Sequence, residues 1–122
     1  MAKKILLVED DKSLRDALHK KIQSENYELI EATNGNEALA QFTKESPDLI
    51  LLDLVMPEKS GFEVLEEIRI KHNSKVKVII LSNLDSVDDR ELAKNLGISN
   101  YIEKSNISLT DLMVKVKKAL SA

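Results

Sequence analysis

Short aliphatic runs alternate with segments of helical periodicity along the whole chain, and this alternation most limits the folds available to it. Five runs are predicted to be strands: KILLVE (4–9), YELIEA (27–32), DLILLD (48–53), VKVIIL (76–81) and NYIEK (100–104). Helices are predicted after each of them, at about 12–25, 35–46, 59–73, 86–96 and 108–121. Such alternation indicates right-handed crossovers, a parallel sheet and helices on both of its faces.

The order of the strands follows from their polarity. The central runs are almost continuously aliphatic, as expected of strands covered on both faces, whereas YELIEA and NYIEK are more polar and are predicted at the edges. For five strands the common doubly wound order is 2-1-3-4-5. We therefore expect an α/β, flavodoxin-like fold in which residues 1–122 form a single domain.

Local signals support the ends of two predicted helices. Ser108 with Asp111, and Ser86 with Asp89, are variants of the capping box at a helix start. Gly97 can adopt the left-handed conformation that ends a helix.

Composition excludes several classes of function. Of 122 residues, none is cysteine, which excludes disulfides, thiolate zinc sites and thiol nucleophiles. A formal net charge of -3 gives little support for direct nucleic-acid binding, which requires a strong excess of Lys and Arg. No segment has the apolar length of a membrane span, and the first apolar run is too short for a signal peptide. We expect a cytoplasmic protein that does not associate with membranes.

Polar residues stand at the carboxyl ends of four predicted strands. Strand one ends in Glu9 and Asp10, strand three in Asp53, strand four in Ser82 and strand five in Lys104. In an open doubly wound sheet, ligands bind outside the carboxyl ends of the strands. Taken singly, Asp10 or Ser82 also fits an ordinary role in a turn or a helix cap. Together, the five residues predict a site.

The chemistry of these residues indicates a metal-assisted phosphoryl site. Clustered carboxylates repel one another unless a cation lies among them, and magnesium prefers a few oxygen ligands and several waters. We expect Asp10, Asp53 and the backbone carbonyl of Val55 to bind Mg²⁺, for which Mn²⁺ can substitute, with Glu9 binding directly or through a water. A nearby amine and hydroxyl suit phosphoryl transfer, in which Asp53 is the candidate nucleophile.

Four motifs resemble those of one family. The motifs LLVEDD, LLDLVMPEKSG, VIILSN and YIEK, in this order, are similar to the receiver domain of two-component response regulators of the chemotaxis-regulator type. The resemblance covers essentially the whole sequence. It implies that Asp53 accepts a phosphoryl group from a sensor histidine kinase or a histidine phosphotransfer protein. Glu9 and Asp10 would hold the magnesium, and Lys104 would pair with the phosphate.

The resemblance also implies a conformational switch. Ser82 would move toward the phosphate and Tyr101 would swing inward, which would reshape the surface formed by the last two helices and the strand between them. This surface would bind a downstream protein target or output domain, or join two copies of the domain. Such a domain is a signalling protein that assists its own phosphotransfer and dephosphorylation, not an enzyme in the ordinary sense. Without the motifs, Tyr101 would be interpreted as a packing residue.

Three positions depart from the family pattern. Ser105 follows Lys104 where the family usually has a proline with a cis peptide bond. A non-proline cis bond costs about 2.5–4 kcal/mol, so the loop is either trans or strained. Asn83 stands where alanine or glycine is usual, and its side chain narrows the approach to Asp53. Glu9 replaces an aspartate, which is a common variant.

Three alternatives are weighed against this interpretation. A magnesium-dependent aspartyl phosphatase of the haloacid-dehalogenase type needs a second acid two residues after the nucleophile, where this chain has Val55. A flavin module needs a phosphate-binding loop after strand one, but EDDKSL would repel phosphate. A receiver-like adaptor that works without phosphorylation stays open because of Ser105 and Asn83. The sequence fits a single-domain regulator or a part of a longer protein.

Overall fold

The computed structural model describes residues 2–83 and 87–121, which form one parallel sheet covered by helices. The strands are β1 (Lys4–Val8), β2 (Glu28–Ala32), β3 (Leu49–Asp53), β4 (Lys77–Ser82) and β5 (Asn100–Glu103). Their order is β2-β1-β3-β4-β5, and every neighbouring pair is parallel. The predicted fold class and strand order are confirmed, with the two more polar strands at the edges.

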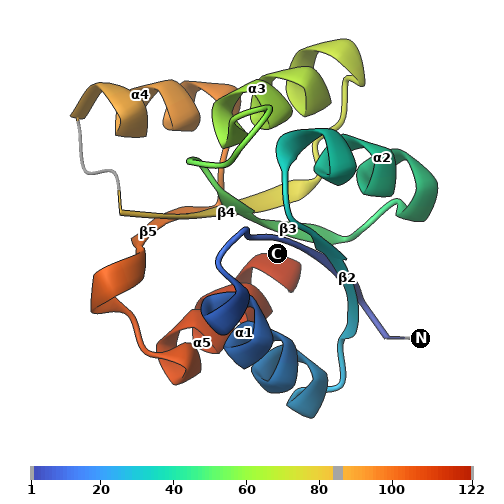
Figure 1. Cartoon of the computed structure of the whole chain (residues 1–122), viewed down its shortest axis with the longest axis vertical. Helices are drawn as coiled ribbons and strands as arrows, with labels where there is room; N and C mark the ends of the chain where they lie inside the picture. The colour runs from blue at the N-terminus through green and yellow to red at the C-terminus, as the bar shows by residue number, and fades with distance from the viewer. Residues whose placement is uncertain (1, 84–86, 122) are drawn as a thin grey trace.

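The helices lie in two layers on either side of the sheet (Figure 1). They are α1 (Lys12–Ser24), α2 (Gly35–Glu45), α3 (Gly61–Glu66), α4 (Val87–Leu96) and α5 (Leu109–Leu120). A π-helical turn, η1 (Glu67–Lys71), continues α3, and a 3-10 turn, η2 (Lys104–Asn106), follows β5. Helices α1 and α5 cover one face, and α2, α3 and α4 cover the other.

Side chains that alternate along the strands build a separate core under each layer. On β1, Ile5 and Leu7 pack toward α1 and α5, whereas Leu6 and Val8 pack toward α2 and α3. The same alternation on β3 makes all five of its residues buried. Because both faces are covered, a continuous aliphatic run is needed. Full burial of one such side chain contributes about 1.5–3 kcal/mol, so these runs fix the positions of the strand ends.

Two of the predicted helix boundaries are confirmed. Ser108 caps α5 by accepting a hydrogen bond from the Asp111 N–H at 3.1 Å. Gly97 follows α4 with a φ of +88°, in the left-handed region. The predicted cap at Ser86 lies outside the described residues. A cap at Asp11, whose Oδ1 accepts from the Leu14 N–H at 3.1 Å, begins α1 directly after the acidic pair.

The third helix begins later than predicted, at Gly61 instead of 59. Ser60 and Glu63 form a reciprocal capping box at its start. The loop before it turns back on itself, since the Gly61 N–H donates to the Leu54 carbonyl at 3.0 Å. A Cβ on Gly61 would lie 2.1 Å from the carbonyl oxygen of Asp53. Only glycine allows α3 to begin this close to the end of β3.

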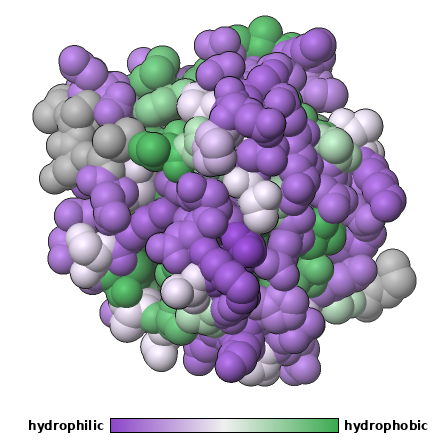
Figure 2. All heavy atoms as spheres, viewed as in Figure 1, coloured by the Kyte–Doolittle hydropathy of each residue, from purple (hydrophilic) through white to green (hydrophobic). Residues whose placement is uncertain are grey.

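The surface seen from the same side as Figure 1 is mostly hydrophilic, with small and separate apolar areas (Figure 2). Among the described residues, the large apolar side chains that are exposed are Val55, Ile70, Leu92 and Val114. No helix among residues 2–83 and 87–121 has both the length and the apolar character needed to cross a membrane.

Candidate functional site

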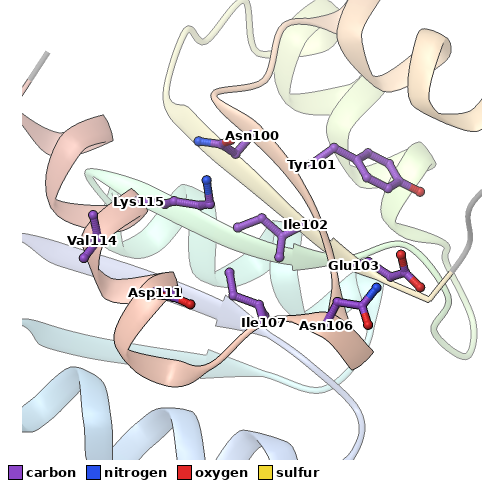
Figure 3. Close-up of a pocket in the computed structure, with 9 residues that line it drawn as sticks. All are labelled: Asn100, Tyr101, Ile102, Glu103, Asn106, Ile107, Asp111, Val114 and Lys115. Atoms are coloured by element: carbon purple, nitrogen blue, oxygen red, sulfur yellow. The ribbon is translucent and has the colours of Figure 1, made fainter.

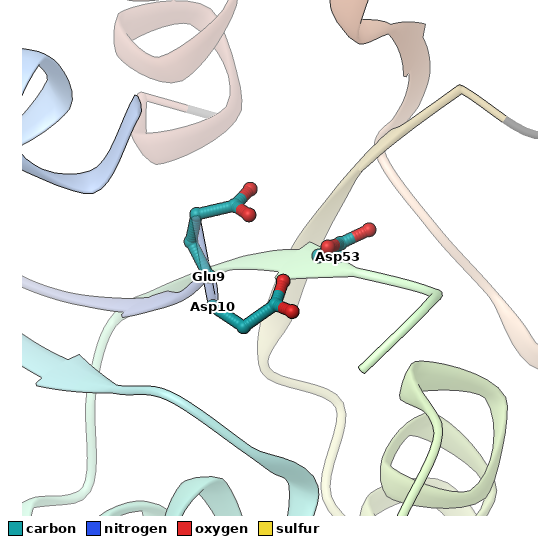
Figure 4. A group of neighbouring side chains, drawn as sticks. All are labelled: Glu9, Asp10 and Asp53. Carbon is teal, nitrogen blue, oxygen red and sulfur yellow. The ribbon is translucent and has the colours of Figure 1, made fainter. Parts of the chain in front are cut away.

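Three carboxylates meet where β1 and β3 end. Glu9 and Asp10 follow β1, Asp53 is the last residue of β3, and these strands are neighbours with Val8 beside Leu52. One carboxylate oxygen from each acid lies within 4.8 Å of the other two. Figure 4 shows the side chains of Glu9 and Asp10 directed toward the end of β3. The predicted convergence of these acids is observed.

Two of the acids are buried. Glu9 is 1% exposed and Asp53 is 3% exposed, whereas Asp10 is exposed to solvent. Burial is the largest influence on both buried acids, and it raises the pKa of Glu9 and of Asp53 above the ordinary values. Repulsion acts in the same direction, from Asp53 on Glu9 and from Asp10 on Asp53. A further positive charge in this place would therefore be stabilising.

Lys104 supplies one positive charge. Its Nζ lies 3.0 Å from Asp53 Oδ2 and 2.8 Å from Glu9 Oε1, and it donates a hydrogen bond to Glu9 Oε2 at 3.1 Å. Burial lowers the pKa of Lys104, but its hydrogen bonds to Glu9 and Asp53 outweigh burial and leave the pKa raised. The lysine is thus held in its charged form between two carboxylates.

Lys104 reaches Asp53 although Ser105 replaces the usual proline. Strand β5 ends at Glu103, one residue earlier than predicted, and Lys104 begins the 3-10 turn η2. The described residues contain no cis peptide bond, so the Lys104–Ser105 bond is trans. Of the two predicted possibilities for this loop, the trans form is the one observed.

Backbone N–H groups and one unbonded oxygen complete the surroundings of the acids. Asp53 Oδ1 accepts from the Val55 N–H at 3.2 Å, and Glu9 Oε2 accepts from the Asp11 N–H at 3.1 Å. Glu9 Oε1 is close to Lys104 but is not oriented to accept its hydrogen bond, and it has no hydrogen-bond partner among the described residues. A buried carboxylate oxygen with available lone pairs, beside two further carboxylates, fits a hard cation that binds oxygen.

An open hollow gives access to this group. It is lined by Glu9, Asp10, Asp11, Asp53, Val55, Asn83 and Lys104. Val55, a residue that is 57% exposed, and the exposed Asn83 are among the residues that line it. Asn83 thus occupies the approach to Asp53, as predicted.

Ser82 and Tyr101 are not among the residues that line this hollow. Ser82 is fully buried at the end of β4, one residue beyond Leu81, which is paired with Asp53. Tyr101 is half-buried on β5 and packs in the core beneath α2, α3 and α4, with the guanidinium carbon of Arg90 4.8 Å from its ring centre. This is a cation–π contact. The structure shows the packing role of Tyr101, and its switch role stays a prediction.

Strand β5 is bordered by a hollow on each side. One lies between β5 and α5 and is lined by residues that include Ile107, Val114 and Lys115 (Figure 3). The other lies between β5 and α4 and includes Lys94 and Ile98. Figure 3 shows the side chain of Tyr101 directed away from α5. The surface of α4, β5 and α5, which the family resemblance predicts to bind partners, is therefore hollowed on both sides of β5.

Comparisons with known proteins agree with the geometry. The family model described as the response regulator receiver domain matches residues 5–117. The chain is 30% identical to a CheY-like receiver domain protein from Methanospirillum hungatei, with a TM-score of 0.93, covering 99% of this chain and 95% of that one. It is 29% identical to a DNA-binding response regulator of the LuxR family from Staphylococcus aureus (TM-score 0.89; 97% and 98% covered). It is 25% identical to the BeF3-activated receiver domain of RstA from Klebsiella pneumoniae (TM-score 0.88; 98% and 100% covered).

Proposed function

Because this chain belongs to the response regulator receiver domain family, we propose that it is a phosphorylated switch in which Asp53 accepts the phosphoryl group. The observation that carries the proposal is the position of Asp53. It is buried at the end of the central strand, paired with Lys104 at 3.0 Å, and lines an open hollow. A carboxylate that only stabilised the fold would need no access from solvent.

The proposed reaction is a transfer from a phosphohistidine of a sensor kinase or a histidine phosphotransfer protein. A carboxylate oxygen of Asp53 bonds to phosphorus, the bond from phosphorus to the histidine nitrogen breaks, and that nitrogen keeps the electron pair. The product is an aspartyl phosphate. Lys104 is already beside Asp53. After the transfer the negative charge lies on the phosphoryl oxygens and no longer on the Asp53 carboxylate, so the ammonium of Lys104 pairs with a phosphoryl oxygen.

Receiver domains use Mg²⁺, and the acids of this site fit it. Asp10, Asp53 and the Val55 carbonyl are the proposed ligands, with Glu9 as a further ligand, directly or through a water, by its unbonded Oε1. When bound, the cation neutralises negative charge on the carboxylates and the phosphoryl oxygens. Mn²⁺ has suitable chemistry to replace it.

The output is proposed to pass through Ser82 and Tyr101 to the surface of α4, β5 and α5. Ser82 follows Leu81, the residue paired with Asp53, so β4 ends beside the proposed phosphoacceptor and carries a hydroxyl there. Inward movement of Tyr101 would change its contact with Arg90 on α4. The two hollows beside β5 would change with it, and a downstream protein, an output domain or a second copy would bind there.

The proposal is tested with a small acyl phosphate donor and magnesium. We expect intact-protein mass spectrometry to show a single base-labile phosphoryl adduct on the wild type and none on Asp53→Ala. Ser82→Ala, which leaves the acids in place, is expected to be phosphorylated more slowly. A wild type that stays unmodified would favour an adaptor that works without phosphorylation, and equal modification of Asp53→Ala would place the phosphoacceptor elsewhere.

A further inference from the structure

Arg15 joins the acidic loop, the segment of Glu9 and Asp10 between β1 and α1, to two other elements, although Arg15 is not among the residues that line the hollow. It belongs to the first turns of α1, and its Nη1 donates to the carbonyl oxygens of Glu9 at 3.0 Å and Asp10 at 3.3 Å. Its Nε lies 3.2 Å from Glu31 Oε2 on β2. The Arg15 side chain is 17% exposed. One guanidinium thus connects β2, α1 and the backbone that carries two of the proposed metal ligands.

These contacts fix the orientation of Glu9 and Asp10. The Glu9 N–H donates to the Ala32 carbonyl at 3.0 Å, so the main chain of Glu9 is held on one side by β2 and on the other by Arg15. Rotation of this segment would turn both carboxylates away from Asp53, because the side chains follow the backbone. A loop held in this way presents its carboxylates with little reorganisation when a cation binds.

Glu31 in turn orients Arg15. Glu31 lies on β2 one residue before Ala32 and is paired with Leu7 of β1. Its side chain contacts Arg15 on α1. Its second oxygen, Oε1, lies 2.6 Å from Nδ1 of His19, one helical turn beyond Arg15. The carboxylate is therefore fixed by two partners from α1, and the arginine has a defined direction.

We propose that Arg15 is a positioning residue that sets the magnesium affinity of the Glu9–Asp10 pair. This inference rests on the proposed function of the site. The planar guanidinium can donate to two carbonyls while it pairs with a carboxylate, which the compact ammonium of a lysine cannot do in the same geometry. Charge alone is not sufficient, and Arg15→Lys is therefore the informative variant.

The chain offers a matched control in Arg69. This half-buried arginine also donates to backbone carbonyls, at 3.0 Å to Leu96, 2.7 Å to Gly97 and 3.0 Å to Ser74. Ser74 lies before β4, Leu96 is the last residue of α4, and Gly97 lies between α4 and β5. These carbonyls are therefore near the amino ends of β4 and β5, at the opposite end of the sheet from the acids. Loss of Arg69 removes the same kind of contact without touching the acidic loop.

The experiment measures magnesium dissociation constants by calorimetry for the wild type, Arg15→Lys, Glu31→Gln and Arg69→Lys. We expect about tenfold weaker binding for Arg15→Lys, as for other residues that orient metal ligands, and a smaller loss for Glu31→Gln. Arg69→Lys is expected to stay within about twofold of the wild type even if its melting temperature falls. Hydrogen exchange of the metal-free proteins in chelator adds a second readout. Amides of residues 9–14 should exchange faster in Arg15→Lys only.

The outcomes separate this inference from the proposed function. A wild type that binds no magnesium would overturn the proposed function. A wild type that binds it, with Arg15→Lys equal to the wild type in affinity and in exchange, would overturn the role of Arg15 alone. If the loss of magnesium affinity in Arg15→Lys and Arg69→Lys were proportional to the fall in their melting temperatures, Arg15 would be a general stabilising residue and the proposal would be wrong. If Arg15→Lys does not fold, Glu31→Gln decides, and affinity equal to the wild type would reject the role.

Discussion

Lys104 and Asp53 are 51 residues apart in the sequence and form a direct ion pair of 3.0 Å at the carboxyl rim of the sheet. The same ammonium also contacts Glu9. One positive charge therefore faces three carboxylates, two of them buried. Burial, with a smaller contribution from repulsion between the acids, keeps the pKa of Asp53 and of Glu9 raised in spite of that charge. The metal-free site is held together by Lys104 and remains short of positive charge.

The first prediction concerns the lysine. Lys104→Met leaves Glu9 and Asp53 without their cation, and we expect the free energy of unfolding in chelator to fall by about 1.5–3 kcal/mol, as for lost hydrogen bonds to charged groups. Urea denaturation measures this loss. The same substitution in an Asp53→Asn background should cost less, since one of the two partners is already neutral. Equal losses in both backgrounds would show that Lys104 does not act through Asp53.

The second prediction concerns Asp53 without metal. Asp53→Asn keeps the shape of the side chain and removes one of the crowded charges, so we expect a gain of about 1 kcal/mol in chelator, in contrast to most substitutions. Thermal melts test it, and a clear loss would mean that Asp53 stabilises the fold. With saturating magnesium the order should reverse, because the wild type gains the free energy of ligand binding.

The third prediction is a pH dependence. The folded protein raises the pKa of Asp53 and Glu9 above their ordinary values of 3.8 and 4.5, chiefly by burial. As pH rises above these values, the unfolded chain loses its protons first, so the folded state binds more protons and the free energy of unfolding falls. We expect the advantage of Asp53→Asn over the wild type in chelator to grow with pH above about 4 and then level off. Urea denaturation at a series of pH values measures it, and an advantage independent of pH would contradict the raised pKa.

Topology explains how much of the site could be predicted from the sequence. Once β1 and β3 are recognised by their aliphatic runs, the doubly wound order makes them neighbours and brings Glu9, Asp10 and Asp53 to one rim. This inference needs only strand ends, which burial on both faces fixes to within a residue. The acids were therefore predictable without knowledge of any side-chain conformation.

Other features depend on geometry that periodicity does not describe. The reach of Lys104 is set by the turn η2, and the contacts of Arg15 depend on a long side chain that folds back from α1 toward the loop before it. Arg15 is one of 18 lysines and arginines, and only its place five residues after Asp10 distinguishes it. The later start of α3 was available from the sequence, since Ser60 and Glu63 have the spacing of a capping box.

The last prediction concerns Gly61, which lets α3 begin against the end of β3. A Cβ there would lie 2.1 Å from the Asp53 carbonyl oxygen and 2.7 Å from the Leu54 Cα, both backbone atoms that must move. We expect Gly61→Ala to lower the free energy of unfolding by about 1–3 kcal/mol, as overpacking does, and to weaken magnesium binding because the end of β3 shifts. Urea denaturation and calorimetry measure the two effects.

Gly97→Ala is the control for Gly61→Ala. Its added Cβ meets only the Nε of Arg69 at 3.7 Å, so the cost comes from the φ of +88° and not from a clash. This strain is about 1–2 kcal/mol for an L-residue, a loss comparable to that of Gly61→Ala at a position far from the acids. Magnesium affinity should therefore fall in Gly61→Ala and stay unchanged in Gly97→Ala. Equal affinities in the two variants would show that the contact of Gly61 with β3 does not determine the position of Asp53.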